Sequence, residues 1–264
     1  MNVFRQEIRQ NRNSTIVWTA ALIAIAALYI SIFPSITGNT SISDVYQNFP
    51  EAFRKAFNIT ADTLTAFSGL YALALNLILL TGAVQAMNLG IGIVSKEARL
   101  KTADFLLTRP VSRGSILRQK LLTVVTLLVL TDLVFLATDW LLIKAIISDP
   151  FRFRTFIVSS LSLVFIQAFF AAFGFLLGSV LPRVKTVIAV TLPAVFGFYI
   201  IGLFDTVIGV DKVKFLTPFK FFDVNALTAG GGYETVTLVY LAALTAGAVI
   251  TGFIVYQRKD IHTV

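Results

Sequence analysis

Two carboxylates inside a long apolar run are the side chains of this sequence best suited to chemistry. Asp132 and Asp139 are seven residues apart, so on a helix they lie on nearly the same face. An ionisable group in an apolar, membrane-length segment is a functional candidate by default. Asp132 is therefore a candidate to line a cavity or to couple an ion. The favoured interpretation is a carboxyl group that is hydrogen-bonded to neighbouring helices.

Other catalytic chemistry has little support in the sequence. The chain has no Cys and one His, His262 near the C-terminus, so neither a Cys/His metal cluster nor a Ser/His/Asp arrangement is expected. It also lacks the G-x-x-x-x-G-K-[ST] phosphate loop. We therefore expect no catalytic residue, no bound metal and no cofactor in this chain, which is predicted not to be an enzyme.

The composition indicates a membrane protein. Of the 264 residues 56% are hydrophobic and 14% are charged, whereas soluble domains are about 25% charged. A spanning helix needs about 20 mostly apolar residues. We predict one all-α transmembrane domain over residues 1–264, with a surface helix at 1–15, a hairpin at 95–120 and outer loops at 37–63 and 205–235. The six predicted transmembrane helices are 16–36, 64–94, 121–147, 156–181, 187–204 and 236–256.

The net charge of +8 follows this topology. With six spans both termini lie on one side, and that side holds fourteen of the 22 Lys and Arg residues and only four of the fourteen acids. Cytoplasmic loops carry an excess of Lys and Arg, so the N and C termini are predicted to be cytoplasmic. The excess of base therefore reports membrane orientation, and no nucleic-acid partner is expected.

The hairpin at 95–120 carries seven of those basic residues and a shaped element. Thr102 can cap a helix, and Asp104 in its first turn suits the helix dipole. Pro110 disfavours helical geometry at the residue before it. A short helix at about 102–108 is therefore predicted between two long helices. Its apolar stripe is suited to docking another protein, whereas an ordinary positive-inside loop would need only the charge.

Small residues predict close contacts between helices. Gly82, Ala86 and Gly90 are spaced by four in the second span, as are Gly174 and Gly178 in the fourth. This spacing lets two helix backbones approach closely. The contact is equally expected within one subunit and between two.

The hairpin resembles that of the permease subunits of type-2 ABC exporters. The resemblance lies in Glu97, in Thr102-Ala-Asp-Phe-Leu-Leu, in Arg109-Pro-Val-Ser-Arg113 and in Lys120. The six-span layout and Tyr256-Gln-Arg-Lys-Asp-Ile are also similar. Lys101 and Gln119 depart from the family, which usually has Gly at both positions.

The resemblance implies a coupling helix that docks on a separate cytosolic ATPase subunit, which would bind ATP and Mg. A second permease copy or paralogue would complete a homo- or heterodimer in the lipid bilayer. The residues implied at the ATPase interface are Glu97, Thr102, Asp104, Phe105, Leu106, Arg109 and Arg113. Because spans two and five line the cavity in that family, the cavity candidates are Asn76, Leu80, Phe196 and Tyr199, beside Asp132.

These features predict the permease subunit of an ATP-driven exporter that works by alternating access. We expect a multi-pass protein of the plasma membrane of a bacterium or archaeon, with an amphipathic peptide, a lipid or a drug as substrate. The rival is a secondary transporter or channel that uses Asp132 as a proton or cation site. Such transporters often show paired broken helices in the two halves of the chain, and no such pair is visible. A third class is a structural or immunity protein without transport.

Overall fold

The fold is a bundle of long helices. A computed structural model describes residues 3–39, 50–51, 54, 66–100, 113–147, 151–181, 184–208 and 215–258, without the side chains of 36–39, 97–100, 113 and 205–208. Within these residues there are no strands, and six helices are long and apolar enough to cross a membrane. They are α1 (Val3–Asn39), α5 (Phe67–Leu100), α7 (Arg113–Ile146), α8 (Phe153–Val180), α9 (Val187–Ile208) and α11 (Thr235–Arg258). The prediction of an all-α protein with six transmembrane helices is confirmed.

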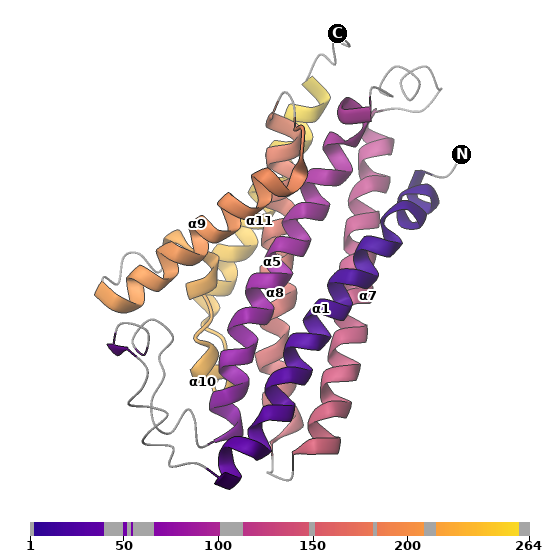
Figure 1. Ribbon diagram of the computed structural model, residues 1–264. Helices are drawn as coiled ribbons and strands as arrows, with labels where there is room; N and C mark the ends of the chain where they lie inside the picture. The colour runs from indigo at the N-terminus through magenta and orange to yellow at the C-terminus, as the bar shows by residue number, and fades with distance from the viewer. Residues whose placement is uncertain are drawn as a thin grey trace.

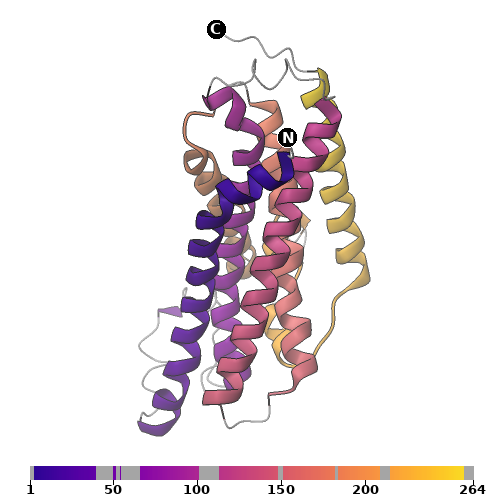
Figure 2. The same cartoon turned by 90° about the vertical axis from the view of Figure 1, so that its right-hand side faces the viewer.

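The helices pack as a central pair with two flanking groups. The most extensive pairing joins α5 and α8, which are also the most buried spans. α1 and α7 pair with each other on one side, while α9 packs on α5 and α11 packs on α8 (Figures 1 and 2). The start of α1, the end of α5, the start of α7 and the end of α11 lie together at the top in Figure 1. We call this the basic end, because it holds the excess of Lys and Arg.

Glycines explain the close approach of α5 and α8. A side chain at Gly174 would place its Cβ 2.5 Å from the Met87 carbonyl oxygen, and one at Gly90 would lie 2.3 Å from the Ala171 carbonyl oxygen. Both obstacles are backbone atoms of the facing helix, so no side-chain movement could relieve them. The small-residue spacing therefore marks a contact within this subunit.

Several helix ends differ from the predicted span ends. α5 continues to Leu100 and α7 already begins at Arg113, so at most residues 101–112 of the predicted hairpin lie between helices. The extensions consist largely of Lys, Glu, Ala, Arg, Leu and Gln, which favour helix whether or not they are apolar. Apolar length therefore located the spans but not the helix ends.

The predicted division of the N-terminal region at residue 15 is not a helix end. α1 runs unbroken from Val3, and its first turns are inclined to the remainder (Figure 2). Asn11, Thr15 and Thr19 each donate a side-chain hydrogen bond to the carbonyl oxygen four residues earlier, at 2.9, 3.0 and 2.8 Å. Such bonds compete with the backbone ladder and often bend helices. A bend replaces the expected break.

Two short elements lie between α9 and α11, beside the part of the bundle away from the basic end (Figure 1). These are η2 (Pro218–Lys220) and α10 (Val224–Thr228), both inside the predicted outer loop 205–235. Asp223 caps α10 by accepting from Ala226 N at 3.0 Å. Thr217 donates to the Phe198 carbonyl oxygen at 2.7 Å, which ties the segment to α9.

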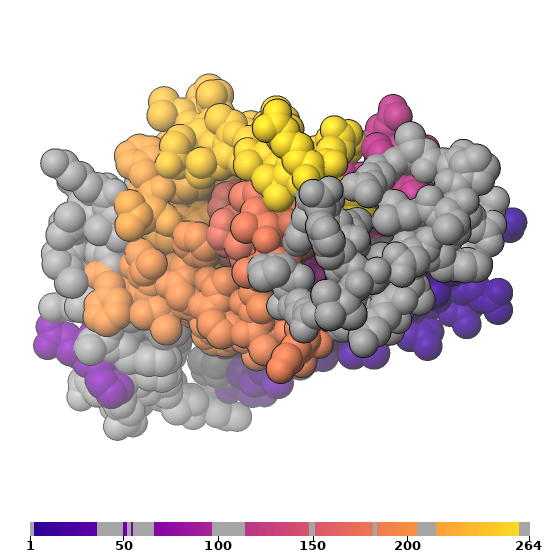
Figure 3. All heavy atoms as spheres, turned by 90° about the horizontal axis from the view of Figure 1, so that it is seen from above, coloured from indigo at the N-terminus to yellow at the C-terminus, as the bar shows by residue number. Residues whose placement is uncertain are grey.

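The outward faces of the flanking helices are apolar. On α9 the exposed side chains repeat every four residues and form one stripe of Ile188, Leu192, Phe196, Ile200 and Phe204. α11 also carries exposed Val and Ile residues. Seen from the basic end, α1 and α11 lie at different edges of the molecule (Figure 3). Lipid chains or a second subunit suit such surfaces.

Candidate functional site

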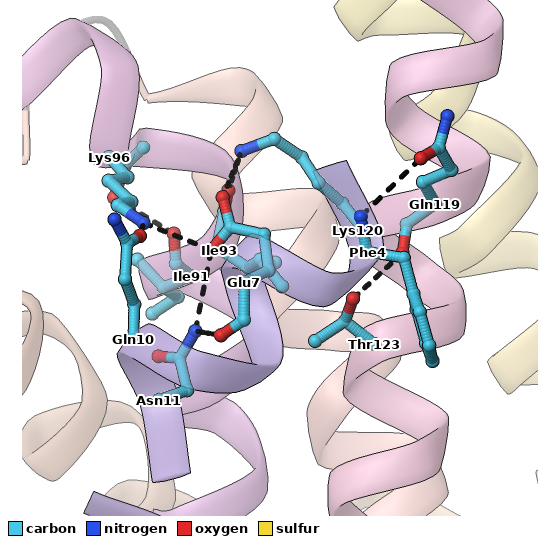
Figure 4. Close-up of polar contacts among 11 residues, drawn as sticks. Phe4, Glu7, Gln10, Asn11, Ile91, Ile93, Lys96, Gln119, Lys120 and Thr123 are labelled. Atoms are coloured by element: carbon cyan, nitrogen blue, oxygen red, sulfur yellow. Dashed lines mark hydrogen bonds and ion pairs between the residues drawn. The ribbon is translucent and has the colours of Figure 1, made fainter. Parts of the chain in front are cut away.

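An ionic junction joins three helices at the basic end. It consists of Glu7 on α1, Lys96 on α5 and Lys120 on α7 (Figure 4). Lys96 Nζ lies 3.0 Å from Glu7 Oε2, and Lys120 Nζ lies 3.6 Å from Glu7 Oε1. Glu7 is 4% exposed and Lys120 is fully buried. Buried charges are costly unless paired, so each carboxylate oxygen here has its own cation.

Neighbouring hydrogen bonds strengthen the junction. Lys120 also donates to the Ile93 carbonyl oxygen, and Lys96 donates to Gln10 Oε1. The backbone N–H of Phe4 donates to Gln119 Oε1 at 3.4 Å (Figure 4). The start of α1 is therefore fastened both to the end of α5 and to the start of α7.

The junction sits at the two roots of the predicted hairpin. Lys96 lies four residues before the end of α5, and Lys120 lies seven residues after the start of α7. The predicted interface residues Thr102, Asp104, Phe105, Leu106 and Arg109 lie outside the described residues. Glu97 and Arg113 belong to α5 and α7, but their side chains are likewise not described.

A pocket of about 460 Å³ opens beside the junction. α1 contributes Gln10, Asn11, Ser14, Thr15 and Trp18, and α5 contributes Gln85, Asn88, Leu89, Gly92, Ile93 and Lys96; Val187 of α9 completes the lining. Six of these twelve residues carry an amide or a hydroxyl group. Lys96 belongs to both the pocket and the junction, and its partner Gln10 also lines the pocket, so the two features adjoin.

Asn88 gives this pocket its clearest ligand-binding feature. Its half-buried side chain has no hydrogen-bond partner among the described residues. It lies eight residues before Lys96, which places it about 12 Å deeper along α5. An amide without a partner at that depth costs free energy unless water or a ligand supplies hydrogen bonds.

A second polar cluster lies deeper, where four helices meet. The Thr131 hydroxyl of α7 accepts from Gln85 of α5 at 3.0 Å and lies 3.2 Å from the Thr19 hydroxyl of α1. The Gln167 amide of α8 lies beside Asp132, and with its nitrogen turned to the carboxyl group it donates to the two oxygens at 2.9 and 3.1 Å. Asp132 is 6% exposed. This arrangement matches the interpretation of Asp132 as a carboxyl group bonded to a neighbouring helix.

The other cavity candidates are dispersed. Asn76 donates to the Ala72 carbonyl oxygen of its own helix at 2.9 Å, and Leu80 packs against the hydrophobic core. Tyr199 packs on Phe219 with ring centroids 5.3 Å apart, and Phe196 lies on the exposed stripe of α9. Neither these four residues nor Asp132 lines the pocket beside the junction. A common role for them stays a prediction.

Sequence reasoning missed the junction. By charge alone, Glu7 is one of the four acids on the basic side, and Lys96 and Lys120 are two of its fourteen basic residues; Lys120 also belongs to the hairpin motif. The available signal was weak: Glu7 is the single acid among residues 1–15, which contain three arginines. The described residues contain no group of three or more His, Cys, Asp or Glu side chains placed to hold a metal ion.

Comparison with known families shows to which family the chain belongs. Residues 4–257 match the family described as the C-terminal domain of the multidrug efflux system permease Rv1217c. The chain belongs to this permease family. The six apolar helices and the family together show a multi-pass membrane protein. No curated protein was found to match the sequence.

The sequence predicts that this chain is a transport subunit, and membership of this efflux permease family confirms that prediction. The type-2 class, the ATP-driven mechanism and the coupling helix stay predictions.

Proposed function

We propose that the chain is the membrane subunit of an ATP-driven ABC exporter that moves amphipathic compounds. The observation that carries this proposal is the match to an efflux permease family over residues 4–257. The hairpin motif resembles the ATPase-docking element of type-2 exporters. ATP and Mg would be bound by a separate cytosolic subunit, and the basic end would face the cytoplasm.

A second permease would complete the transport path. The exposed apolar stripe of α9 and the exposed faces of α1 and α11 supply enough apolar surface for lipid and for a partner. We propose a dimer of this chain or a pair with a paralogue, in the plasma membrane of a bacterium or archaeon. Closure of the ATPase pair would push on residues 101–112 and change the exposure of the cavity.

The pocket beside the junction would receive the polar part of the substrate. It has amide and hydroxyl groups of α1 and α5 along its walls and an unpartnered Asn88 amide, and Trp18, Leu89 and Ile93 add apolar surface. Mixed linings of this kind suit molecules with a polar end and an apolar body.

The test is co-purification with the ATPase encoded by a neighbouring gene. Phe105→Asp and Leu106→Asp each place a charge in the short predicted helix of the hairpin, and each should reduce ATPase recovery at least about tenfold, the factor equal to 1.4 kcal/mol. Leu216→Asp is the matched control, because Leu216 is 63% exposed in the segment between α9 and α11, outside the hairpin. Absence of an ATPase from the wild-type complex, or full recovery with both hairpin variants, would contradict the proposal.

Asp132→Asn should have the smaller effect. The asparagine keeps the shape of the carboxyl group and can still pair with Gln167 by exchange of amide donor and acceptor. Efflux of rhodamine 6G from cells should therefore fall less than with Phe105→Asp at equal membrane expression. Complete loss of efflux with normal ATPase recovery would instead favour an ion-coupled role for Asp132.

A further inference from the structure

The helices of this subunit form two groups that the hairpin connects. α1 pairs more extensively with α7 than with α5, and α5 pairs most extensively with α8, whereas α5 and α7 share few contacts. One group is therefore α1 with α7, and the other is α5 with α8. Residues 101–112 run from the end of α5 to the start of α7, so a force on them acts between the groups.

Polar contacts hold the two groups together at two levels. In the middle, Gln85 donates to Thr131 at 3.0 Å and Gln167 pairs with Asp132. Farther from the basic end, the Tyr71 hydroxyl of α5 donates to Asp139 of α7 at 2.7 Å. Because an unpaired buried polar group is costly in an apolar environment, these contacts resist separation. The pocket lies beyond the middle level, toward the basic end.

At the basic end the polar contacts between the groups are the Glu7–Lys96 ion pair and two hydrogen bonds, from Lys96 to Gln10 Oε1 and from Lys120 to the Ile93 carbonyl oxygen. Glu7 and Lys120 belong to the α1–α7 group, and Lys96 belongs to the α5–α8 group. The Lys96 side chain is 20% exposed, whereas that of Lys120 is fully buried. Water can therefore replace Glu7 as the partner of Lys96 at lower cost than as the partner of Lys120. The Glu7–Lys96 pair is the weaker side of the junction, and it adjoins the pocket.

We propose that the Glu7–Lys96 ion pair is a latch on the pocket. When the hairpin is pushed, the pair opens together with the bond from Lys120 to the Ile93 carbonyl oxygen, and α1 with α7 rocks away from α5 about the middle polar contacts. Gln10, Ser14 and Trp18 then move away from Asn88, so the pocket widens at the basic end. This inference rests on the proposed function, because the ATPase supplies the push. Glu7 acts as a positioning residue, since it sets the place of α1 without lining the pocket.

The absence of Cys from the sequence permits a direct test. Asn88→Cys provides a single thiol in the pocket, and its maleimide labelling rate is measured in the complex with ADP or with ATP, Mg and vanadate. Gly232→Cys is the control, because a Cβ there meets no atom within 4 Å and lies outside the pocket. We expect nucleotide to change the Asn88→Cys rate about tenfold and to leave the Gly232→Cys rate unchanged.

Removing the latch should abolish that difference. When Glu7→Gln is combined with Asn88→Cys, maleimide should label the thiol fast in both nucleotide states. ATPase recovery and basal ATP hydrolysis of Glu7→Gln should stay at the wild-type level. Rhodamine 6G should then no longer stimulate hydrolysis. The reversed pair, Glu7→Lys with Lys96→Glu, should restore part of the slow labelling with ADP. Arg9→Gln, which neutralises an exposed charge on the same helix, should behave as wild type.

The outcomes separate the latch from the proposed function. If no ATPase binds the wild type, the proposed function fails, but labelling of the isolated permease still compares Glu7→Gln with wild type. If the ATPase binds and Glu7→Gln labels as slowly as wild type with ADP, the latch is wrong. If Glu7→Gln does not fold, Lys96→Gln removes the same pair from its more exposed side and the same two rates decide.

Discussion

Replacing Gly174 with alanine should destabilise this permease severely, although it adds a single methyl group. The new Cβ would lie 2.5 Å from the Met87 carbonyl oxygen, 3.1 Å from Met87 Cα and 3.2 Å from Ile91 N. These are backbone atoms, so α5 and α8 would have to move apart along the most extensive contact of the fold. Overpacking of this kind costs about 1–3 kcal/mol and sometimes more. We expect the upper part of that range or beyond.

The matched control is the same substitution at Gly197 in α9. A Cβ there meets no atom within 4 Å. Alanine is favoured over glycine inside a helix by about 1 kcal/mol, so Gly197→Ala should be neutral or stabilising. The free energy of unfolding, measured by titration with SDS in mixed micelles, separates the two variants. Equal stability of Gly174→Ala and Gly197→Ala would contradict the close α5–α8 contact.

This contact also shows what the glycine pattern could and could not predict. The four-residue spacing of Gly174 and Gly178 predicts a close helix contact, but the same spacing serves a dimer equally well. Only the position of α5 decides that Gly174 faces Met87 within the subunit. The face of α9 that carries Phe196 is instead exposed.

Apolar length was sufficient to predict the six spans, because each must cross the same apolar layer. It was not sufficient to predict α5 beyond residue 94 or α7 before residue 121. There the helix continues in charged sequence, where local propensity decides. Mean hydropathy over a sequence window also does not predict the bend in α1. Asn11, Thr15 and Thr19 bond to carbonyl oxygens of their own helix there, and such bonds depend on individual side chains.

The ionic junction could not be predicted from spacing. Glu7 and Lys96 are separated by 89 positions, and no periodic pattern connects residues so far apart. The positive-inside rule correctly places Lys96 and Lys120 with the basic group but treats them as interchangeable. In the structure Lys120 is fully buried and Lys96 is partly exposed, and this difference carries the proposed latch.

Asp132 and Asp139 both lie on α7, and each is bonded to a different neighbouring helix. Their spacing predicted a shared face, and both are indeed buried. Asp132 pairs with α8 through Gln167, and Asp139 pairs with α5 through Tyr71. Each acid therefore joins the α1–α7 group to the α5–α8 group.

Tyr71→Phe should also destabilise the protein strongly, and it tests this arrangement. The Tyr71 hydroxyl donates to Asp139 Oδ2 at 2.7 Å, and the Ser160 hydroxyl lies 3.0 Å from it. Asp139 is 1% exposed, and its other oxygen has no hydrogen-bond partner. Phenylalanine keeps the ring but removes the donor, which would leave a buried carboxyl group unsatisfied. That penalty is about 1–3 kcal/mol, and it is greater for a charged group.

A second substitution distinguishes the lost donor from damage to packing. Tyr71→Phe combined with Asp139→Leu removes both partners, so the double variant should be more stable to SDS than Tyr71→Phe alone. Ser160→Ala should cost less than Tyr71→Phe, because the bond from Tyr71 to Asp139 remains. If the double variant is instead the least stable of the three, ring packing rather than the hydrogen bond holds α5 to α7. The middle contacts at Asp132 would then have to resist separation of the two helix groups without support from Tyr71.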